Sequence, residues 1–93
     1  MQLQIYQLKK ENQRLYAFMD YNWAIKNNFK LDRYECVWEE NIDSDTSLEE
    51  IFERFNIDRP DEFKGHSLSV SDIIDLEGNK YYVDDFGFKK IEE

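Results

Sequence analysis

Alternating apolar and polar positions begin the chain. Leu3 and Ile5 alternate with glutamines, which is the period-2 pattern of a half-buried strand. After a polar break, the uncharged run 15–19 predicts a buried strand that pairs back on the first, with a helix as the alternative. The run 34–38 combines aromatic and β-branched residues and predicts a further strand, which ends at the two glutamates that follow it.

Helical spacing is clearest over residues 47–55. A Ser-x-x-Glu capping box begins at Ser47, and apolar residues follow it at i, i+3, i+4 and i+7, so we expect this face to pack on a sheet. The apolar stripe consists of Leu48, Ile51, Phe52 and Phe55. The pattern also allows a short second helix at about 21–27, capped by Asp20 or Asn22.

The last third of the chain predicts a hairpin. Strand-like runs at 73–76 and 81–83 flank the turn-forming pair Gly78 and Asn79, and Gly87 interrupts the final apolar run with a bulge or bend. The resulting fold class is α+β: a small two-layer domain with an antiparallel sheet of four or five strands and one main amphipathic helix. The predicted chain order is β-β-(α)-β-α-β-β, and one face of the sheet is free to stay exposed.

Composition is that of one folded domain spanning residues 1–93. The chain has 93 residues, 41% hydrophobic and 16% aromatic, which excludes a disordered segment and leaves room for one core. No apolar run reaches the length of a membrane helix, and the amino terminus lacks a secretory pattern, so we expect a cytoplasmic location. A single cysteine, Cys36, suits a reducing compartment and is expected to be a small buried residue.

Charge narrows the class of partner. The formal net charge of −9 repels phosphate backbones and anionic lipid headgroups, so neither nucleic acid nor a membrane is expected as a direct ligand. The same charge favours a protein partner with a basic surface, although solubility alone also accounts for an acidic chain.

Catalytic patterns are weak. His66 is followed by Ser67 and Asp72, but neighbours on an extended segment point to opposite faces and do not assemble a nucleophilic triad. There is no phosphate-binding glycine loop, and one histidine with one cysteine is too few for a transition-metal site. The sequence therefore predicts no enzyme, no catalytic residue, no metal and no cofactor.

Two segments resemble a known family. Residues 56–72 and 81–88 resemble the YodL-like domain family, and residues 5–8 and 48–55 are similar to it as well. The resemblance covers nearly the whole chain and is loose over 9–46. It implies a small module of low-GC Gram-positive bacteria and their mobile elements, with no established catalytic role. The chain departs from the family where His-Pro is usual, at Arg59-Pro60, and where Asp-Ser-Phe-Gly-Phe is usual, at Asp84-Asp85-Phe86-Gly87-Phe88.

Together these observations predict a non-catalytic acidic protein-binding module from a mobile element. Its expected role is to inhibit a host nucleic-acid-binding or defence protein, of the anti-restriction or anti-CRISPR type, by imitating the phosphates of DNA. The alternatives are a partner in a cytoskeletal or replication assembly, or a small enzyme that uses His66. The predicted partner-binding residues are Asp58, Asp61, Glu62, Phe63, His66, Asp72, Asp84, Asp85 and Phe86.

Overall fold

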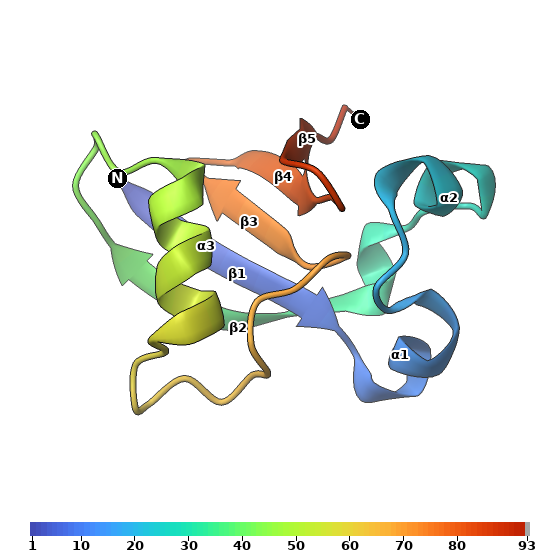
Figure 1. Cartoon of the computed structure of the whole chain (residues 1–93), viewed down its shortest axis with the longest axis horizontal. Helices are drawn as coiled ribbons and strands as arrows, with labels where there is room; N and C mark the ends of the chain where they lie inside the picture. Colours follow the sequence, from blue (N-terminus) through green and yellow to red (C-terminus); the bar gives the residue numbers. More distant parts are fainter. Residues whose placement is uncertain (93) are drawn as a thin grey trace.

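The computed structural model describes residues 1–92, in which a sheet is combined with three short helices (Figure 1). The strands are β1 (Gln2–Leu8), β2 (Tyr34–Asn41), β3 (Ile73–Leu76), β4 (Asn79–Val83) and β5 (Phe88–Lys90). The helices are α1 (Lys10–Tyr16), α2 (Tyr21–Lys26) and α3 (Leu48–Ile57), and the 3₁₀ turn Leu31–Arg33 precedes β2. Within the described residues, none of the helices has the length and apolarity needed to cross a membrane.

All five strands form one antiparallel sheet in the order β2-β1-β3-β4-β5. β1 has a neighbour on each side, and its side chains Leu3 and Ile5 are completely buried. The pair α1–α2 connects β1 to β2, and α3 connects β2 to β3. The predicted α+β class with an antiparallel sheet is confirmed, with five strands in the chain order β-α-α-β-α-β-β-β.

The strand predicted at 15–19 is wrong, because these residues end α1 and begin the loop to α2. The chain turns into α1 directly after β1, where Gln13 Nε2 donates to the Leu8 carbonyl oxygen at 3.2 Å. β2 takes the position beside β1 that the 15–19 run was expected to fill, and it extends beyond the glutamates that were predicted to end it. Leu15 and Phe18 are consequently exposed, at 63% and 69%.

α3 confirms the helix predicted from the capping box. Ser47 Oγ accepts from the Glu50 amide at 3.1 Å, and Glu50 Oε1 accepts from the Ser47 amide at 3.0 Å, so two amides at the helix start are satisfied. Ile51 and Phe55 are buried against the sheet, as the stripe predicts. The helix ends at Ile57, two residues beyond the predicted limit. The short helix predicted at 21–27 is also confirmed as α2, with Asp20 as its cap.

β3 and β4 form the predicted hairpin, but its turn begins one residue earlier than expected. The two turn residues are Glu77 and Gly78, with φ of 53° and 88°, while Asn79 already pairs with Leu76. Two consecutive positive φ values are typical of the tight hairpin turn that matches strand twist, and glycine adopts the second without strain. Gly87, at φ 74°, lies in the next turn, so the predicted interruption is a connection between β4 and β5.

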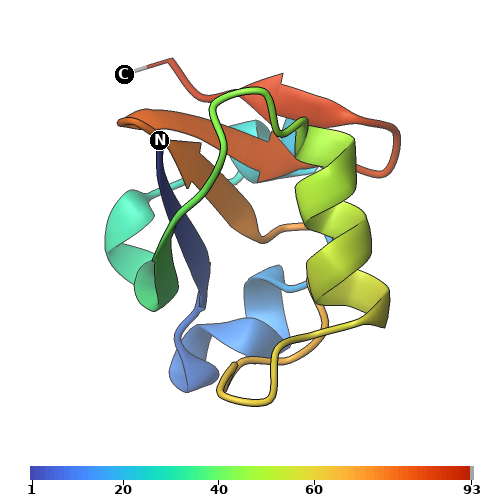
Figure 2. The same cartoon turned by 90° about the vertical axis from the view of Figure 1, so that its left-hand side faces the viewer.

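Apolar clusters lie on both faces of the sheet. On the α3 face the buried residues are Leu3, Ile5, Ile51, Phe55, Phe63, Leu68, Ile74 and Val83. On the other face they are Leu8, Ala24, Tyr34, Ile73, Tyr82 and Ile91. The ring of Tyr82 packs against Tyr21 and Phe29 with centroids 5.1 and 5.8 Å apart, so the α2 region covers one end of the face that was expected to stay open. Figure 2 shows α3 standing along one side of the sheet.

Cys36 is exposed, so the prediction of a buried cysteine is wrong. It lies on β2, which is an edge strand and has a neighbour on one side only. Its Sγ donates a weak hydrogen bond to the Trp38 carbonyl oxygen at 3.4 Å. The strand pattern does not reveal that β2 lies at the edge of the sheet or which of its side chains are covered.

Two phenylalanines should respond oppositely to truncation. Phe55 is fully buried and Phe86 is 87% exposed. We expect F55A to lower the free energy of unfolding by about 3–5 kcal/mol, because it leaves a cavity in the core, and F86A to change it by less than about 0.5 kcal/mol. Urea unfolding followed by circular dichroism measures both. Equal effects of the two substitutions would contradict this packing.

Candidate functional site

A groove of about 480 Å³ lies between α3 and the turn that joins β4 to β5. Its lining residues are Glu49, Phe52, Glu53, Asn56, Ile57, Val70, Val83, Asp84, Asp85, Gly87 and Phe88. We call it the acidic groove, because four of these eleven described residues are acidic and none of the eleven is basic.

The periodicity of α3 determines which of its side chains line the acidic groove. Glu49, Glu53 and Ile57 are spaced four residues apart, so they follow one flank of the helix beside its buried stripe. Phe52 lies between that flank and the core and packs edge-on against Phe88 of β5, with ring centroids 6.2 Å apart. The groove therefore has an aromatic floor and carboxylates along the helix wall.

Local hydrogen bonds fix the opposite wall. Asp84 Oδ1 accepts from the Tyr21 amide at 3.0 Å and the Asp85 amide at 2.9 Å, and Asp85 Oδ1 accepts from the Phe86 amide at 3.0 Å. Partial burial raises the pKa of the Asp84 carboxyl, but the amide hydrogen bonds outweigh this effect and the net pKa is lowered, so the group is ionised at neutral pH. This turn presents Phe86 to solvent beside the groove.

The carboxylates of the acidic groove are available for a partner. Among residues 1–92, Glu49, Glu53 and Asp85 form no ion pair. Ile57, 76% exposed, and Phe86 add apolar surface next to them. Unpaired carboxylates around exposed apolar side chains suit a ligand that brings both cations and an apolar group.

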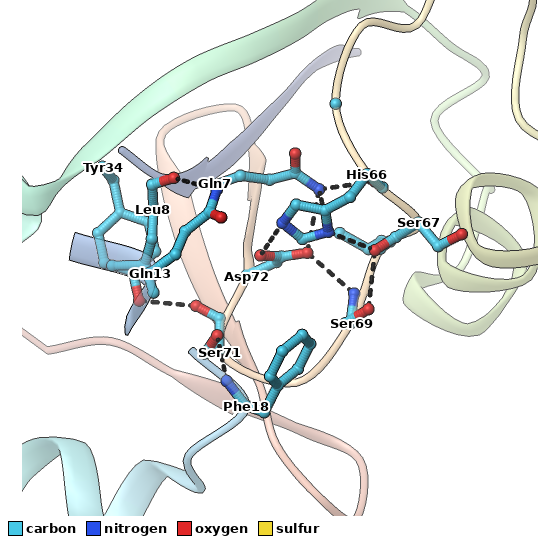
Figure 3. A network of polar contacts seen from close by, with 12 residues as sticks. Gln7, Leu8, Gln13, Phe18, Tyr34, His66, Ser67, Ser69, Ser71 and Asp72 are labelled. Carbon is cyan, nitrogen blue, oxygen red and sulfur yellow. Dashed lines mark hydrogen bonds and ion pairs between the residues drawn. The ribbon is translucent and has the colours of Figure 1, made fainter. Parts of the chain in front are cut away.

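A second cluster surrounds the buried carboxyl of Asp72, which is 1% exposed (Figure 3). Its Oδ2 accepts from the Ser69 amide at 2.9 Å and from Gln7 Nε2 at 3.1 Å. Its Oδ1 lies 3.9 Å from His66 Nε2. Burial raises the pKa of Asp72 to about 8 in spite of the two hydrogen bonds, so the carboxyl keeps its proton at neutral pH.

The Asp72 cluster holds its loop in place. Gln7 Nε2 also donates to the His66 carbonyl oxygen at 2.9 Å, which joins β1 to the loop before β3. The residue that precedes Asp72, Ser71, accepts from the Tyr34 hydroxyl at its carbonyl oxygen (2.6 Å) and from the Phe18 amide at its Oγ (3.1 Å). Four separate parts of the chain are therefore tied together at this point.

Acid–base chemistry has limited support at His66. Its ring lines a cavity of about 390 Å³. Nδ1 lies 2.8 Å from the Ser67 carbonyl oxygen, to which it donates its proton, and Nε2 faces Asp72. Cys36 lines the same cavity, but although this residue is exposed, partial desolvation of its thiol raises the pKa, which is the wrong direction for a nucleophile. No serine or threonine lines this cavity in the described part of the chain.

Comparison with known families identifies the chain. A family model described as the YodL-like domain matches residues 2–93. The chain belongs to the YodL-like domain family. This confirms the resemblance, and the match includes residues 9–46, where the resemblance was loose. No curated protein and no solved structure gave a significant match.

The structure separates the nine residues predicted to bind a partner. Asp84 and Asp85 line the acidic groove and Phe86 is exposed beside it. Asp58, Asp61 and Glu62 are exposed on the loop after α3 and do not line the groove, and His66 lines the other cavity. Phe63 and Asp72 are buried, at 9% and 1% exposed, so they offer a partner little surface. Phe63 packs between the rings of Trp38 and Phe55.

Sequence reasoning missed the helix wall of the acidic groove. Glu49, Glu53 and Ile57 recur every four residues, and an isoleucine at the end of an acidic row was the available signal. Acidic residues in the first turn also favour the start of a helix through its dipole, so their presence does not by itself indicate a binding wall. Which turn would face them depended on sheet order, which the sequence did not provide.

Asp72 should make the stability of the domain fall with rising pH. Its pKa is about 8 in the folded chain and near 3.8 when unfolded, so between these values the folded state holds a proton that unfolding releases. The stabilisation is complete below about pH 4 and is lost as pH rises to about 8. In urea unfolding measured at several pH values, the difference between wild type and D72N, which cannot titrate, isolates this contribution. We expect D72N to gain on wild type as pH increases.

D72A is the matched control for the buried hydrogen bonds. It leaves Gln7 Nε2 and the Ser69 amide without their acceptor, and because neither variant titrates at this position, we expect D72A to be less stable than D72N by about 2–4 kcal/mol at every pH. A pH-independent difference between D72N and wild type would show that Asp72 is ionised in the folded chain.

Proposed function

We propose that the domain is a non-catalytic protein-binding module whose acidic groove binds a basic segment of a protein partner. An apolar side chain of that segment would enter the groove beside Phe86 and Ile57. The observation that supports this most is the coincidence of exposed apolar surface and unpaired carboxylates in a single groove.

The acidic groove would complement such a segment in two ways, through apolar contact and through charge. Burying an exposed aromatic ring and an exposed isoleucine releases water from apolar surface, and such residues are frequent anchors at the centre of interfaces. Arginine and lysine around the anchor would find Glu49, Glu53 and Asp85 unpaired. Apolar contact then supplies affinity, and the charges supply the choice of partner and the rate of encounter.

The proposal extends to inhibition of a nucleic-acid-binding protein. Such proteins present basic surfaces to phosphate, and a surface that is occupied by the acidic groove is closed to DNA or RNA. The family's implied occurrence on mobile elements makes a host defence protein a suitable target. A partner within a cytoskeletal or replication assembly would use the same groove and is the second candidate, favoured by the exposed apolar side chains.

Charge reversal at the groove tests the proposed function. The probe is a fluorescein-labelled peptide of twelve residues, ten lysines and arginines around a central leucine–tryptophan pair, measured by fluorescence anisotropy. We expect micromolar binding at low salt, and a dissociation constant at least tenfold higher for E49K/E53K, because both reversals lie on the groove wall. F86S should weaken binding several-fold without changing stability.

The matched control is E35K/E39K, which changes the net charge by the same amount on β2, at the opposite edge of the sheet from β5. We expect its dissociation constant to stay within threefold of wild type. If E35K/E39K weakens the peptide as much as E49K/E53K does, the acidic surface acts only through bulk charge, and the groove is not a site.

The inhibitor extension has its own test. The domain, immobilised with and without the E49K/E53K substitutions, is used to retain proteins from bacterial lysate, which are identified by mass spectrometry before and after addition of duplex DNA. We expect groove-dependent proteins to be released by DNA. Groove-dependent partners that resist DNA would contradict phosphate imitation and support the assembly role.

A further inference from the structure

Net charge conceals a strong local asymmetry. Residues 9–33, which contain α1 and α2, hold six of the 12 basic residues and only three of the 21 acidic residues, a local formal charge of +3. The rest of the chain carries −12. We call residues 9–33 the basic lobe.

Exposed apolar residues follow the same division. In the described chain six large apolar side chains are exposed. Four belong to the basic lobe and two lie at the acidic groove; they are Leu15, Phe18, Met19 and Ile25, and Ile57 and Phe86, respectively. Each of the two surfaces thus combines exposed apolar side chains with an excess of one charge, positive at the lobe and negative at the groove.

The basic side chains of the lobe also lack carboxylate partners within the described part of their own chain. Among residues 1–92, none of its six basic side chains forms an ion pair with a carboxylate. Arg33 instead stacks on the ring of Tyr16, with its guanidinium carbon 3.9 Å from the ring centroid. The unpaired cations of the lobe match the unpaired anions of the groove.

Phe18 is held outward by strained backbone. Its φ is 66°, a left-handed value that costs a non-glycine residue about 1 kcal/mol or more, and its amide donates to Ser71 Oγ at 3.1 Å. The ring is 69% exposed, so burial of the ring does not repay this strain within the chain.

We infer that the acidic groove of one copy binds the basic lobe of a second copy, so that the domain associates head to tail. The inference rests on the proposed function, and the basic lobe is the segment that the groove binds when no other partner is present. Figure 1 places α1 and α2 at one end of the long axis and α3 toward the other. Because the lobe and α3 lie apart along the long axis (Figure 1), one contact leaves the second groove and the second lobe free, so the product is an open chain or a ring. A closed two-fold dimer, in which each groove binds the lobe of the other copy, would contradict the head-to-tail arrangement.

Long-range repulsion does not prevent this contact. Asp84 of the groove touches the lobe at the Tyr21 amide, but Glu49 and Glu53 lie on α3, toward the other end of the 34 Å long axis (Figure 1). Screening at physiological salt acts over about 8 Å, so these glutamates and the lobe respond mainly to local charge. Association should strengthen at moderately low salt and weaken above it. A basic partner would compete with the second copy for the same groove.

Sedimentation velocity over a range of protein concentrations tests the inference with three proteins. The lobe variant is F18N, in which asparagine accepts the left-handed backbone that phenylalanine strains, so loss of folding is not a concern. The groove variant is E49K/E53K. We expect wild type to form species larger than a dimer as concentration rises, and each variant alone to stay monomeric at concentrations at least tenfold higher.

The decisive sample is an equal mixture of F18N and E49K/E53K. The mixture retains one intact groove and one intact lobe, so we expect a complex of one copy of each and nothing larger. Wild type that remains monomeric, variants that associate as wild type does, or a mixture without a complex would each overturn the inference. The labelled basic peptide, measured on F18N, separates the two proposals: if it binds while wild type stays monomeric, only self-association fails, and if it does not bind, the proposed function fails as well.

Discussion

The packing of α3 across β1 and β3 is the constraint on which the surface of this domain depends. Phe55 and Ile51 occupy the core on that face, and their burial fixes the rotation of the helix. Once the rotation is fixed, the flank that carries Glu49, Glu53 and Ile57 must face the turn between β4 and β5. The acidic groove is therefore a consequence of how the core packs, and a rigid helix forms one of its walls.

The Asp72 cluster performs the corresponding task for the loop before β3. The loop before β3 has no regular structure, and buried hydrogen bonds to Gln7, Ser69 and Tyr34 hold it where apolar packing alone would not. One of these bonds ends at Ser71, the residue that also fixes the Phe18 amide. The same loop thus supports the sheet and sets the exposed position of the basic lobe.

Local patterns predicted what local forces determine. The capping box and apolar stripe gave α3, alternation gave β1, and a glycine gave the β3–β4 turn to within one residue. The strand expected at 15–19 failed because a short apolar run reads equally as strand or helix, and the partner of β1 comes from residue 34 onward. The exposure of Cys36 and the burial of Phe63 and Asp72 did not follow from local patterns, because exposure depends on sheet order and on loops, which follow from long-range contacts.

The site was predictable in part for the same reason. Asp84, Asp85 and Phe86 stood out by composition, but their counterpart on α3 could be recognised only after the fold brought the two segments together. The net charge of −9 was an equally incomplete guide to the candidate site, because it reveals neither the basic lobe nor the acidic groove.

The central claim is that the acidic groove is where a basic partner binds. Its most direct test is an NMR titration of the ¹⁵N-labelled domain with the labelled-peptide sequence, in which every backbone amide except that of Pro60 reports on its own surroundings. The account predicts that shifts concentrate at residues 49–57 and 84–88, which form the two walls of the groove. Shifts centred on residues 64–66 and 35–37, around the His66 cavity, or spread evenly over the acidic surface, would contradict it.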